Sequence, residues 1–287
     1  MITLPSELIR NIVRTALAED VGAGDITTEV SVPVDLLGTA TIIAKEPCVV
    51  AGLALVEAAF RELGGQVQSL LVHDGDVVTT GQRVCVITGP ARAILTGERT
   101  ALNFLQQLSG IATLTRQFVE AVAGTKTQIL DTRKTTPTLR LLEKYAVAAG
   151  GGTNHRLGLF DAAMFKDNHR VILARLGSAA LGQAVAAVRS RQPHIPIVIE
   201  ADTLADVETA LAAGANHILL DNMSLDELRE SVQWVAGRAK LEASGGVRLA
   251  TVRAIAETGV DYISVGALTH SARAVDFSLE MQTADVG

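Results

Sequence analysis

Four segments between residues 195 and 266 decide the fold class of this chain. They read IPIVIE (195–200), HILLD (217–221), KLEASGG (240–246) and YISVG (262–266). Each has an apolar centre of strand length, and the intervals between them carry the spacing of amphipathic helices. Strands that alternate with helices over short connections run parallel, because each helix carries the chain back to the starting edge of the sheet. The sequence therefore predicts a parallel α/β domain.

The same alternation extends upstream to residue 128. Strands are predicted at 128–131 and 162–165, and helices at 138–149 and 179–189. With the four segments above, this makes about six or seven strand–helix units, which suit either a barrel or an open doubly wound sheet. No G-x-G-x-x-G run follows the first strand, which disfavours a dinucleotide-binding sheet. We expect a barrel with fewer than eight strands.

The first hundred residues have a different pattern. Helical spacing at 8–17, with Ser6 as a candidate cap, and at 54–63 is mixed with short β-branched runs between glycines and aspartates. A longer, largely buried helix is predicted from about residue 96 to 122. This region is expected to be α+β.

Composition excludes several classes of protein. The chain has 287 residues, 48% of them apolar and 20% charged, which is globular rather than disordered. A net charge of −6 and only 3% aromatic residues make a nucleic-acid binder a poor interpretation. No apolar run reaches the ~18 residues that a membrane helix needs. Two cysteines cannot build a disulfide framework, and residues 1–7 lack the features of a secretory leader, so a cytoplasmic setting is expected.

Polar residues or glycines suited to a functional site follow nearly every predicted barrel strand. In chain order they are Asp131, Arg133, Lys134, Lys166, Asn168, Glu200, Asp221, Asn222, Ser244, Gly245, Gly246 and Gly266. One aspartate after a strand is most often a helix cap, but the carboxyl ends of parallel barrel strands share one mouth, where chemistry occurs. We therefore predict a site at this mouth.

The charge distribution indicates an anionic ligand. Residues 131–170 hold seven Lys or Arg against four Asp or Glu, within an acidic chain. Arg133, Lys134 and Arg156 flank strand ends or the 150–152 glycine turn and are suited to carboxylate or phosphate. Arg140 and Lys144 lie on a predicted helix, where a solvated face is the simpler interpretation.

Glycines and carboxylates complete the predicted site. Ser244-Gly245-Gly246 and Gly266 follow the last two strands, where barrels commonly hold a phosphate on backbone N–H groups. Glu200 and Asp221 are suited to three roles that stay open here: binding a divalent cation such as Mg²⁺, acid–base work, or stabilising a developing positive charge. No His/Cys cluster indicates zinc, and four histidines are interpreted as structural or surface residues: His73, His194, His217 and His270.

Longer motifs strongly resemble the quinolinate phosphoribosyltransferase family. They are TGERTALN (96–103), DTRKT (131–135), NHRLGL (154–159), KDNH (166–169), LDNM (220–223) and ISVGALT (263–269). The resemblance implies an N-terminal α+β sandwich-like domain (1–110), an incomplete parallel α/β barrel (111–269), and a tail (270–287) that packs on the first domain. It also implies a reaction in de novo NAD biosynthesis. Quinolinate and phosphoribosyl pyrophosphate, with Mg²⁺, give nicotinate mononucleotide, pyrophosphate and CO₂.

The resemblance further implies roles for individual residues. Quinolinate would be bound by Arg99 of a homodimer partner, Thr132, Arg133, His155, Arg156 and Lys166. Lys134 would lie beside the pyrophosphate, and Glu200 and Asp221 beside the ribose and metal, which makes these three the catalytic residues. The 5′-phosphate would be held by Ser244, Gly245, Gly246, Ser264 and Gly266. Two positions depart from the family pattern, since Val198 and Asp202 stand where Glu is usual, so one acidic contact is in question.

Four alternatives stay open on sequence alone. One is a relative associated with molybdenum transport, and another is a nicotinate or nicotinamide phosphoribosyltransferase, which needs fewer cations. The turn at 75–78 resembles that of a biotinyl- or lipoyl-carrier domain, but no lysine occupies the hairpin tip. A pure binding protein would not need Glu200 and Asp221 at a cationic mouth.

Overall fold

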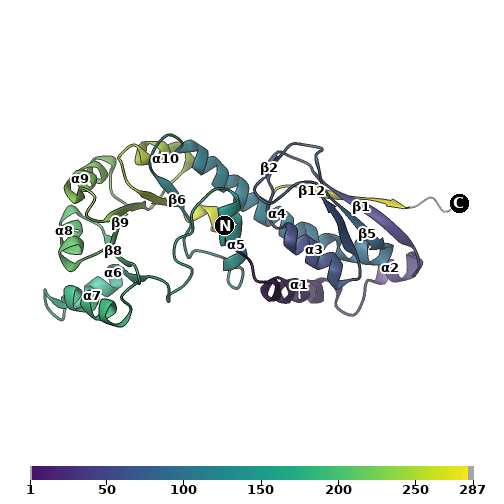
Figure 1. Cartoon of the computed structure of the whole chain (residues 1–287), viewed down its shortest axis with the longest axis horizontal. Helices are drawn as coiled ribbons and strands as arrows, with labels where there is room; N and C mark the ends of the chain where they lie inside the picture. Colours follow the sequence, from purple (N-terminus) through teal and green to yellow (C-terminus); the bar gives the residue numbers. More distant parts are fainter. Residues whose placement is uncertain (1, 284–287) are drawn as a thin grey trace. The chain divides into compact units, whose positions relative to one another are not determined.

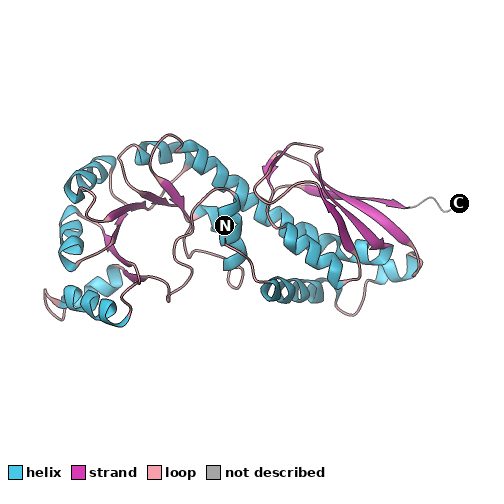
Figure 2. Ribbon diagram, viewed as in Figure 1, coloured by secondary structure: helices cyan, strands magenta, loops and turns pink. Residues whose placement is uncertain are grey.

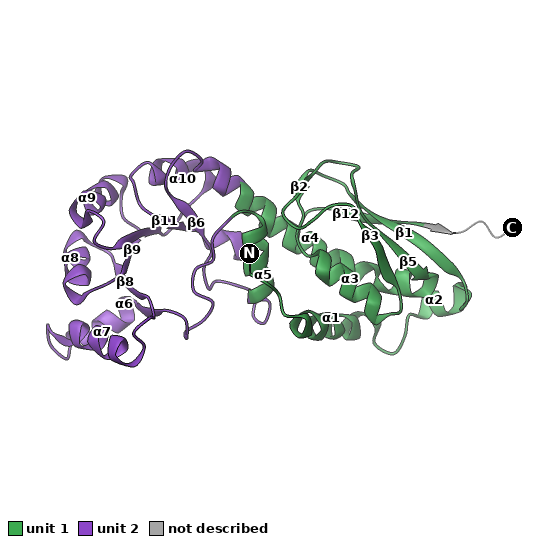
Figure 3. Cartoon of the chain, in the orientation of Figure 1, with its two compact units in different colours: residues 1–116, 141–151, 271–287 green, residues 117–140, 152–270 purple. Residues whose placement is uncertain are grey.

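The structure of the chain, a computed structural model, describes residues 2–283 and comprises two compact units (Figure 3). The first unit consists of residues 1–116, 141–151 and 271–287, and the second of residues 117–140 and 152–270. Helix α4 (Ala91–Ala121) contributes to both, and the boundary predicted at residues 110 and 111 falls within it. Among the described residues, no helix is both long enough and apolar enough to cross a bilayer.

The first unit is built on a four-stranded antiparallel sheet in the order β12-β1-β5-β3 (Figure 1). Its strands are β1 (Leu37–Ala44), β3 (Gln66–Leu70), β5 (Arg83–Pro90) and β12 (Phe277–Thr283). Along β1, buried residues alternate with more exposed ones, as one-sided burial of a strand requires. The tail strand β12 pairs with β1 from Ala44–Phe277 to Gly38–Thr283.

Helices and a short ribbon complete this unit. They are α1 (Ser6–Val21), α2 (Ile26–Ser31), α3 (Leu53–Glu62), α5 (Arg140–Ala149), and the strand pair β2 (Cys48–Val49) and β4 (Val77–Val78). Ser6 lies inside α1, whose N-cap is Pro5 without a side-chain hydrogen bond, so the predicted cap was wrong. The solvated face expected for Lys144 was also wrong, because that side chain is fully buried on α5.

The second unit carries a six-stranded parallel sheet in the order β6-β11-β10-β9-β8-β7. The strands are β6 (Gln128–Leu130), β7 (Ala163–Phe165), β8 (Ile197–Ala201), β9 (His217–Asp221), β10 (Lys240–Ser244) and β11 (Tyr262–Ser264). The last strand returns to pair with the first, while β6 and β7 do not pair with each other. The expected incomplete parallel barrel is confirmed.

Helices line the outer side of this curved sheet (Figure 2). They are α6 (Asp167–Ala174), α7 (Ala180–Arg191), α8 (Leu204–Ala213), α9 (Leu225–Val235) and α10 (Leu249–Ala256). The short α11 (Ala267–His270) follows β11, and its Thr269 Oγ1 donates to Lys134 O (2.7 Å). Helix α6 was not predicted. None of its residues is buried, so packing against the core does not hold this helix.

A loop segment follows β6 at the open edge of the barrel. Thr153 forms a parallel bridge with Leu130, donates its N–H to Ile129 O (2.8 Å), and accepts from Asp131 N–H (3.2 Å). The chain therefore runs alongside β6 for one bridge before it reaches residues 154–156. This bridge fixes where the NHR motif lies relative to the carboxyl end of β6.

Candidate active site

Asp131 organises the loop that carries the NHR motif. Its side chain is fully buried at the end of β6 and accepts hydrogen bonds from Asn154 Nδ2 (2.7 Å) and His155 N–H (2.7 Å). A buried carboxylate must be hydrogen-bonded to be tolerated, so this aspartate and the loop specify each other's position. The sequence placed Asp131 at a strand end but assigned it no role.

A cavity of about 360 Å³ opens among the carboxyl ends of the barrel strands. Its lining residues are Thr132, Arg133, Lys134, His155, Arg156, Met164, Lys166, Glu200, Leu219, Asp221, Glu242, Ser244 and Ser264. Most of the predicted site residues therefore lie together in space. Met164, Leu219 and Glu242 are additions that sequence reasoning did not assign to the site.

One side of the cavity is cationic. Arg156 donates to Ala162 O (3.1 Å) and contacts Met164 Sδ (3.3 Å), which anchors its guanidinium below the rim. Burial and the nearby charge of Arg133 lower the pKa of Arg156. The Nε of Arg133 is buried and has no hydrogen-bond partner among the described residues. Two close guanidiniums, one with an unused buried donor, favour the entry of an anion.

Carboxylates also gather at the cavity. Carboxylate oxygens of Glu200, Asp202 and Asp221 all lie within 4.8 Å of one another. Lys166 Nζ lies 3.2 Å from Glu200 Oε2 and so connects the cationic and acidic sides. Asp202, one of the two departures from the family pattern, thus contributes a carboxylate here, whereas Val198 is buried in β8. Clustered carboxylates are the oxygen ligands that Mg²⁺ prefers.

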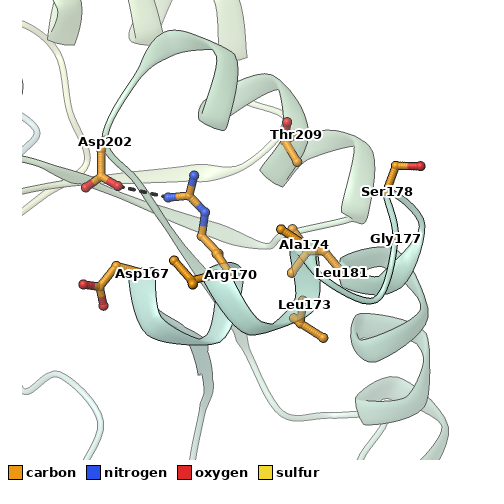
Figure 4. Close-up of a pocket in the computed structure, with 10 residues that line it drawn as sticks. Asp167, Arg170, Leu173, Ala174, Gly177, Ser178, Leu181, Asp202 and Thr209 are labelled. Carbon is orange, nitrogen blue, oxygen red and sulfur yellow. Dashed lines mark hydrogen bonds and ion pairs between the residues drawn. The ribbon is translucent and has the colours of Figure 1, made fainter.

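Arg170 of α6 holds the end of β8 in place (Figure 4). Its guanidinium donates to Glu200 O (2.9 Å) and Asp202 Oδ2 (3.2 Å), and it also pairs with Asp206. A second cavity of about 360 Å³, largely apolar, lies beside this arginine between α6, α7 and α8. Arg170 therefore fixes the direction of the Asp202 side chain. Because α6 was not predicted, the sequence did not reveal this role of Arg170.

The turn after β10 approaches Asn222 too closely for any side chain. Gly245 has φ +96°, and a Cβ at this position would collide with Asn222 Oδ1. Asn222 itself adopts a left-handed conformation and donates its N–H to Ser244 O (2.9 Å). The space at Gly266 is less restricted, since a Cβ there would lie 3.1 Å from His270 Nε2 and 3.2 Å from Lys134 Cδ.

We expect the Gly245→Ala variant to lose about 1–3 kcal/mol of unfolding free energy, because alanine is strained at φ +96°. Displacement of Asn222 by the new methyl group adds to this loss. Urea unfolding measures this loss. Gly182→Ala is the matched control, since Gly182 lies in α7 with open space around it, and its stability should not fall. Equal stability of the two variants would contradict the tight turn.

Glu242 is a fully buried carboxylate at the cavity wall. Its Oε2 lies 3.2 Å from His155 Nε2 and 2.8 Å from His217 Nε2. Burial alone would raise the pKa of Glu242, but the two histidines outweigh it and hold the pKa at about 2. His217, interpreted from the sequence as a structural or surface residue, is thus a structural residue with a buried carboxylate as its partner. The available signal was a glutamate inside an otherwise apolar barrel strand.

The depressed pKa of Glu242 makes the stability of the protein sensitive to acid. The carboxyl has its ordinary pKa of 4.5 when unfolded and about 2 when folded, so its contribution is complete above pH 4.5 and disappears between pH 4.5 and 2. The contribution is on the order of 3 kcal/mol at neutral pH. We expect Glu242→Gln to flatten this acid dependence in urea unfolding at stepped pH. An unchanged slope would show that Glu242 does not carry it.

Arg99 is the one predicted site residue of the first unit. It is exposed on α4, and the second-unit cavity is lined without it. Gly245, Gly246 and Gly266 do not line the cavity either, but they adjoin Ser244 and Ser264, which do.

Comparisons with known families agree over nearly the whole chain. A profile described as "Quinolinate phosphoribosyl transferase, N-terminal domain" matches residues 25–109. A second, described as "Quinolinate phosphoribosyl transferase, C-terminal domain", matches residues 111–280. The second match contains every predicted site residue except Arg99, which lies in the first.

Individual relatives are similar over their full length. A nicotinate-nucleotide pyrophosphorylase [carboxylating] of Mycobacterium leprae is 44% identical, covering 95% of this chain and 96% of that protein. A probable enzyme of the same name from Bacillus subtilis is 43% identical, covering 92% and 90%. The structure of the nicotinate-nucleotide pyrophosphorylase from Francisella tularensis superimposes with a TM-score of 0.90 at 38% identity, covering 98% of each chain. That of NadC from Streptococcus pyogenes gives 0.91 at 40% identity, covering 99% and 100%.

Proposed function

The chain belongs to the quinolinate phosphoribosyltransferase family, and we propose that the cavity at its barrel mouth is where this chemistry occurs. The protein is a decarboxylating quinolinate phosphoribosyltransferase of NAD biosynthesis. It transfers a phosphoribosyl group from phosphoribosyl pyrophosphate to quinolinate, with loss of CO₂. One observation carries the assignment of the site, namely a single cavity lined both by cations (Arg133, Lys134, Arg156, Lys166) and by carboxylates (Glu200, Asp221).

Quinolinate is proposed to bind at the cationic wall. Its two carboxylates match the guanidiniums of Arg133 and Arg156 and the ammonium of Lys166, and the unused Nε of Arg133 supplies a buried donor. Met164 and Leu219 offer apolar surface for the pyridine ring. Thr132 and His155 complete this wall. A substrate with one carboxylate would leave part of this cationic wall without an anion.

Phosphoribosyl pyrophosphate is proposed to bind at the acidic wall and the glycine turns. The turns at Gly245 and Gly266, which carry no side chains and follow the lining residues Ser244 and Ser264, support a 5′-phosphate there, with Ser244, Ser264 and Gly246 as further donors. Lys134 is exposed beside Gly266, where an ammonium can meet the pyrophosphate. Glu200 and Asp221 then face the ribose.

Mg²⁺ is the proposed cofactor, and the donor set fits it. Glu200, Asp202 and Asp221 together offer only carboxylate oxygens, and Lys166 and Arg170 balance part of their charge. Bound there together with the substrate's phosphates, the ion would neutralise charge on the pyrophosphate. Glu200 and Asp221 are the residues proposed to hold it, directly or through water, with Asp202 adjoining.

The chemistry requires alignment and charge neutralisation rather than a protein nucleophile. The bond between C1′ and the pyrophosphate oxygen breaks, the electron pair leaves with pyrophosphate, and the ribose becomes oxocarbenium-like. Carboxylates of Glu200 and Asp221 favour that positive charge. The quinolinate nitrogen then bonds to C1′, and the resulting pyridinium accepts the electrons released when the adjacent carboxylate leaves as CO₂. A proton replaces CO₂ on the ring. Positioning alone can supply ~7–11 kcal/mol.

A homodimer in the cytoplasm is the proposed setting. Arg99 is exposed on α4 and is proposed to reach the quinolinate of a second copy. Four large apolar side chains at and after α2 are also exposed, which supports an interface: Ile26, Val30, Val34 and Leu37. Cys48 and Cys85 are buried free thiols, which suits a reducing compartment.

The proposed function is tested by CO₂ release from carboxyl-labelled quinolinate. We expect release only when phosphoribosyl pyrophosphate and Mg²⁺ are both present, with nicotinate mononucleotide formed in equal amount. Nicotinate in place of quinolinate should give no nucleotide at matched concentration. Release without phosphoribosyl pyrophosphate, or preference for nicotinate, would contradict the assignment.

A further inference from the structure

We propose that Glu242 is a positioning residue of the quinolinate site, which acts by fixing the ring of His155 from beneath and is itself held by His217. This proposal rests on the proposed function and deepens it. It also changes the role of His155, from a direct ligand of the substrate to a support for Arg156.

The pleat of the barrel strands places these groups at two depths. His217, Leu219 and Asp221 alternate onto one face of β9, and the latter two line the cavity. His217 therefore lies on the same inner face, one pleat below the cavity. Glu242 pairs in register with Leu219 and lines the cavity wall, so its carboxylate can reach down to His217 as well as across to His155.

The ring of His155 is engaged at both nitrogens within the protein. Its Nδ1 accepts the backbone N–H of Arg156 (2.7 Å), and its Nε2 lies 3.2 Å from Glu242 Oε2. A nitrogen that accepts a hydrogen bond carries no proton, so the ring proton lies on Nε2, toward the carboxylate. Nε2 is shielded from solvent. Neither nitrogen is therefore offered to a substrate, whereas the Arg156 backbone N–H is held by the ring.

The burial of the Glu242 carboxylate in the barrel requires compensating partners. Burying a charge is costly unless it is paired, and both oxygens of Glu242 are shielded from solvent. The pairs with His155 and His217 are at ion-pair distance but lack the alignment of linear hydrogen bonds. Each contact is thus a close polar contact rather than a linear hydrogen bond, and together they limit where the two rings lie. Tyr262, with its ring centroid 5.3 Å from that of His217, packs against that histidine.

Kinetics of Glu242→Gln separate positioning from simple charge. Loss of the positioning contact should raise the KM for quinolinate by about tenfold or more, with the KM for phosphoribosyl pyrophosphate changed by less than about threefold. His217→Gln should change the same constant in the same direction and by less, since its amide still donates to Glu242. Glu257→Gln and His194→Gln, both exposed, are the matched controls and should leave all constants unchanged.

The sign of the effect decides between the two interpretations. If the Glu242 carboxylate only repelled the carboxylates of quinolinate, its removal in Glu242→Gln would lower the KM for quinolinate. If the wild-type protein is active, an unchanged or lowered KM for quinolinate in Glu242→Gln therefore overturns the proposal. Absence of wild-type turnover would instead overturn the proposed function.

Ring nitrogen NMR of the histidines gives a readout that needs no turnover and no variant at Glu242. In the wild-type protein, His155, assigned by comparison with His155→Gln, should show a slowly exchanging Nε2 proton and an unprotonated Nδ1. A proton on Nδ1, or rapid exchange at Nε2, would overturn the proposal, even if Glu242→Gln does not fold.

Discussion

Replacing Lys166 with alanine is expected to raise the KM for quinolinate by about 100-fold, the upper range for losing a hydrogen-bonded charge. The ammonium lies at the junction of the two walls, 3.2 Å from Glu200 Oε2, and is proposed to bind one substrate carboxylate. Its loss leaves that carboxylate without its cation. Glu200 also loses a partner, so the KM for phosphoribosyl pyrophosphate should rise as well, by about tenfold rather than 100-fold.

Steady-state kinetics with each substrate varied in turn measure the two constants. Lys240→Ala is the matched control, because Lys240 is an exposed lysine of the same unit that pairs with Asp261. Its constants should equal those of the wild type. If Lys166→Ala affects phosphoribosyl pyrophosphate more than quinolinate, the assignment of the cationic wall is wrong.

Replacing Arg99 with alanine is expected to abolish turnover, a loss of about 100-fold or more if a charged group that binds the substrate is removed. If Arg99 serves the site of a second copy, mixed dimers restore activity. A subunit with Arg99→Ala keeps an intact barrel, and a subunit with Lys134→Ala keeps an intact Arg99. One of the two sites in the mixed dimer is then complete.

Activity of refolded one-to-one mixtures measures this rescue. Random exchange makes half of the dimers mixed, and one intact site in each gives about a quarter of wild-type activity. Each variant mixed with itself is the control and should stay inactive. No rescue in mixtures whose exchange is verified by mass spectrometry would contradict a shared site.

Much of the barrel could be predicted because its pattern is local. The apolar centres of β8 to β11 and the polar residues after them follow from strand burial and from the position of barrel active sites. Helix α6 was not found this way, and none of its residues is buried. The start of α4 was also missed, since the helix begins at Ala91, directly after β5, whereas its predicted end agrees within one residue.

The candidate site also contains residues that the sequence predicts and contacts that only the tertiary structure reveals. Arg133, Arg156, Lys166 and Glu200 lie in one cavity, as their places after strand ends or the 150–152 glycine turn predicted. The partnership of Glu242 with His217 depends on register between β9 and β10, which spacing in one strand does not reveal. The burial of Lys144 likewise depends on tertiary packing, since its helix position alone suits solvent equally well.

The most direct test of the cationic wall is a crystal structure of the protein with quinolinate bound. The account requires the pyridine ring between Met164 and Leu219 at the barrel mouth, with its carboxylates within hydrogen-bond distance of Arg133, Arg156 and Lys166. Quinolinate bound elsewhere, or at the mouth with its carboxylates turned away from these three side chains, would contradict it.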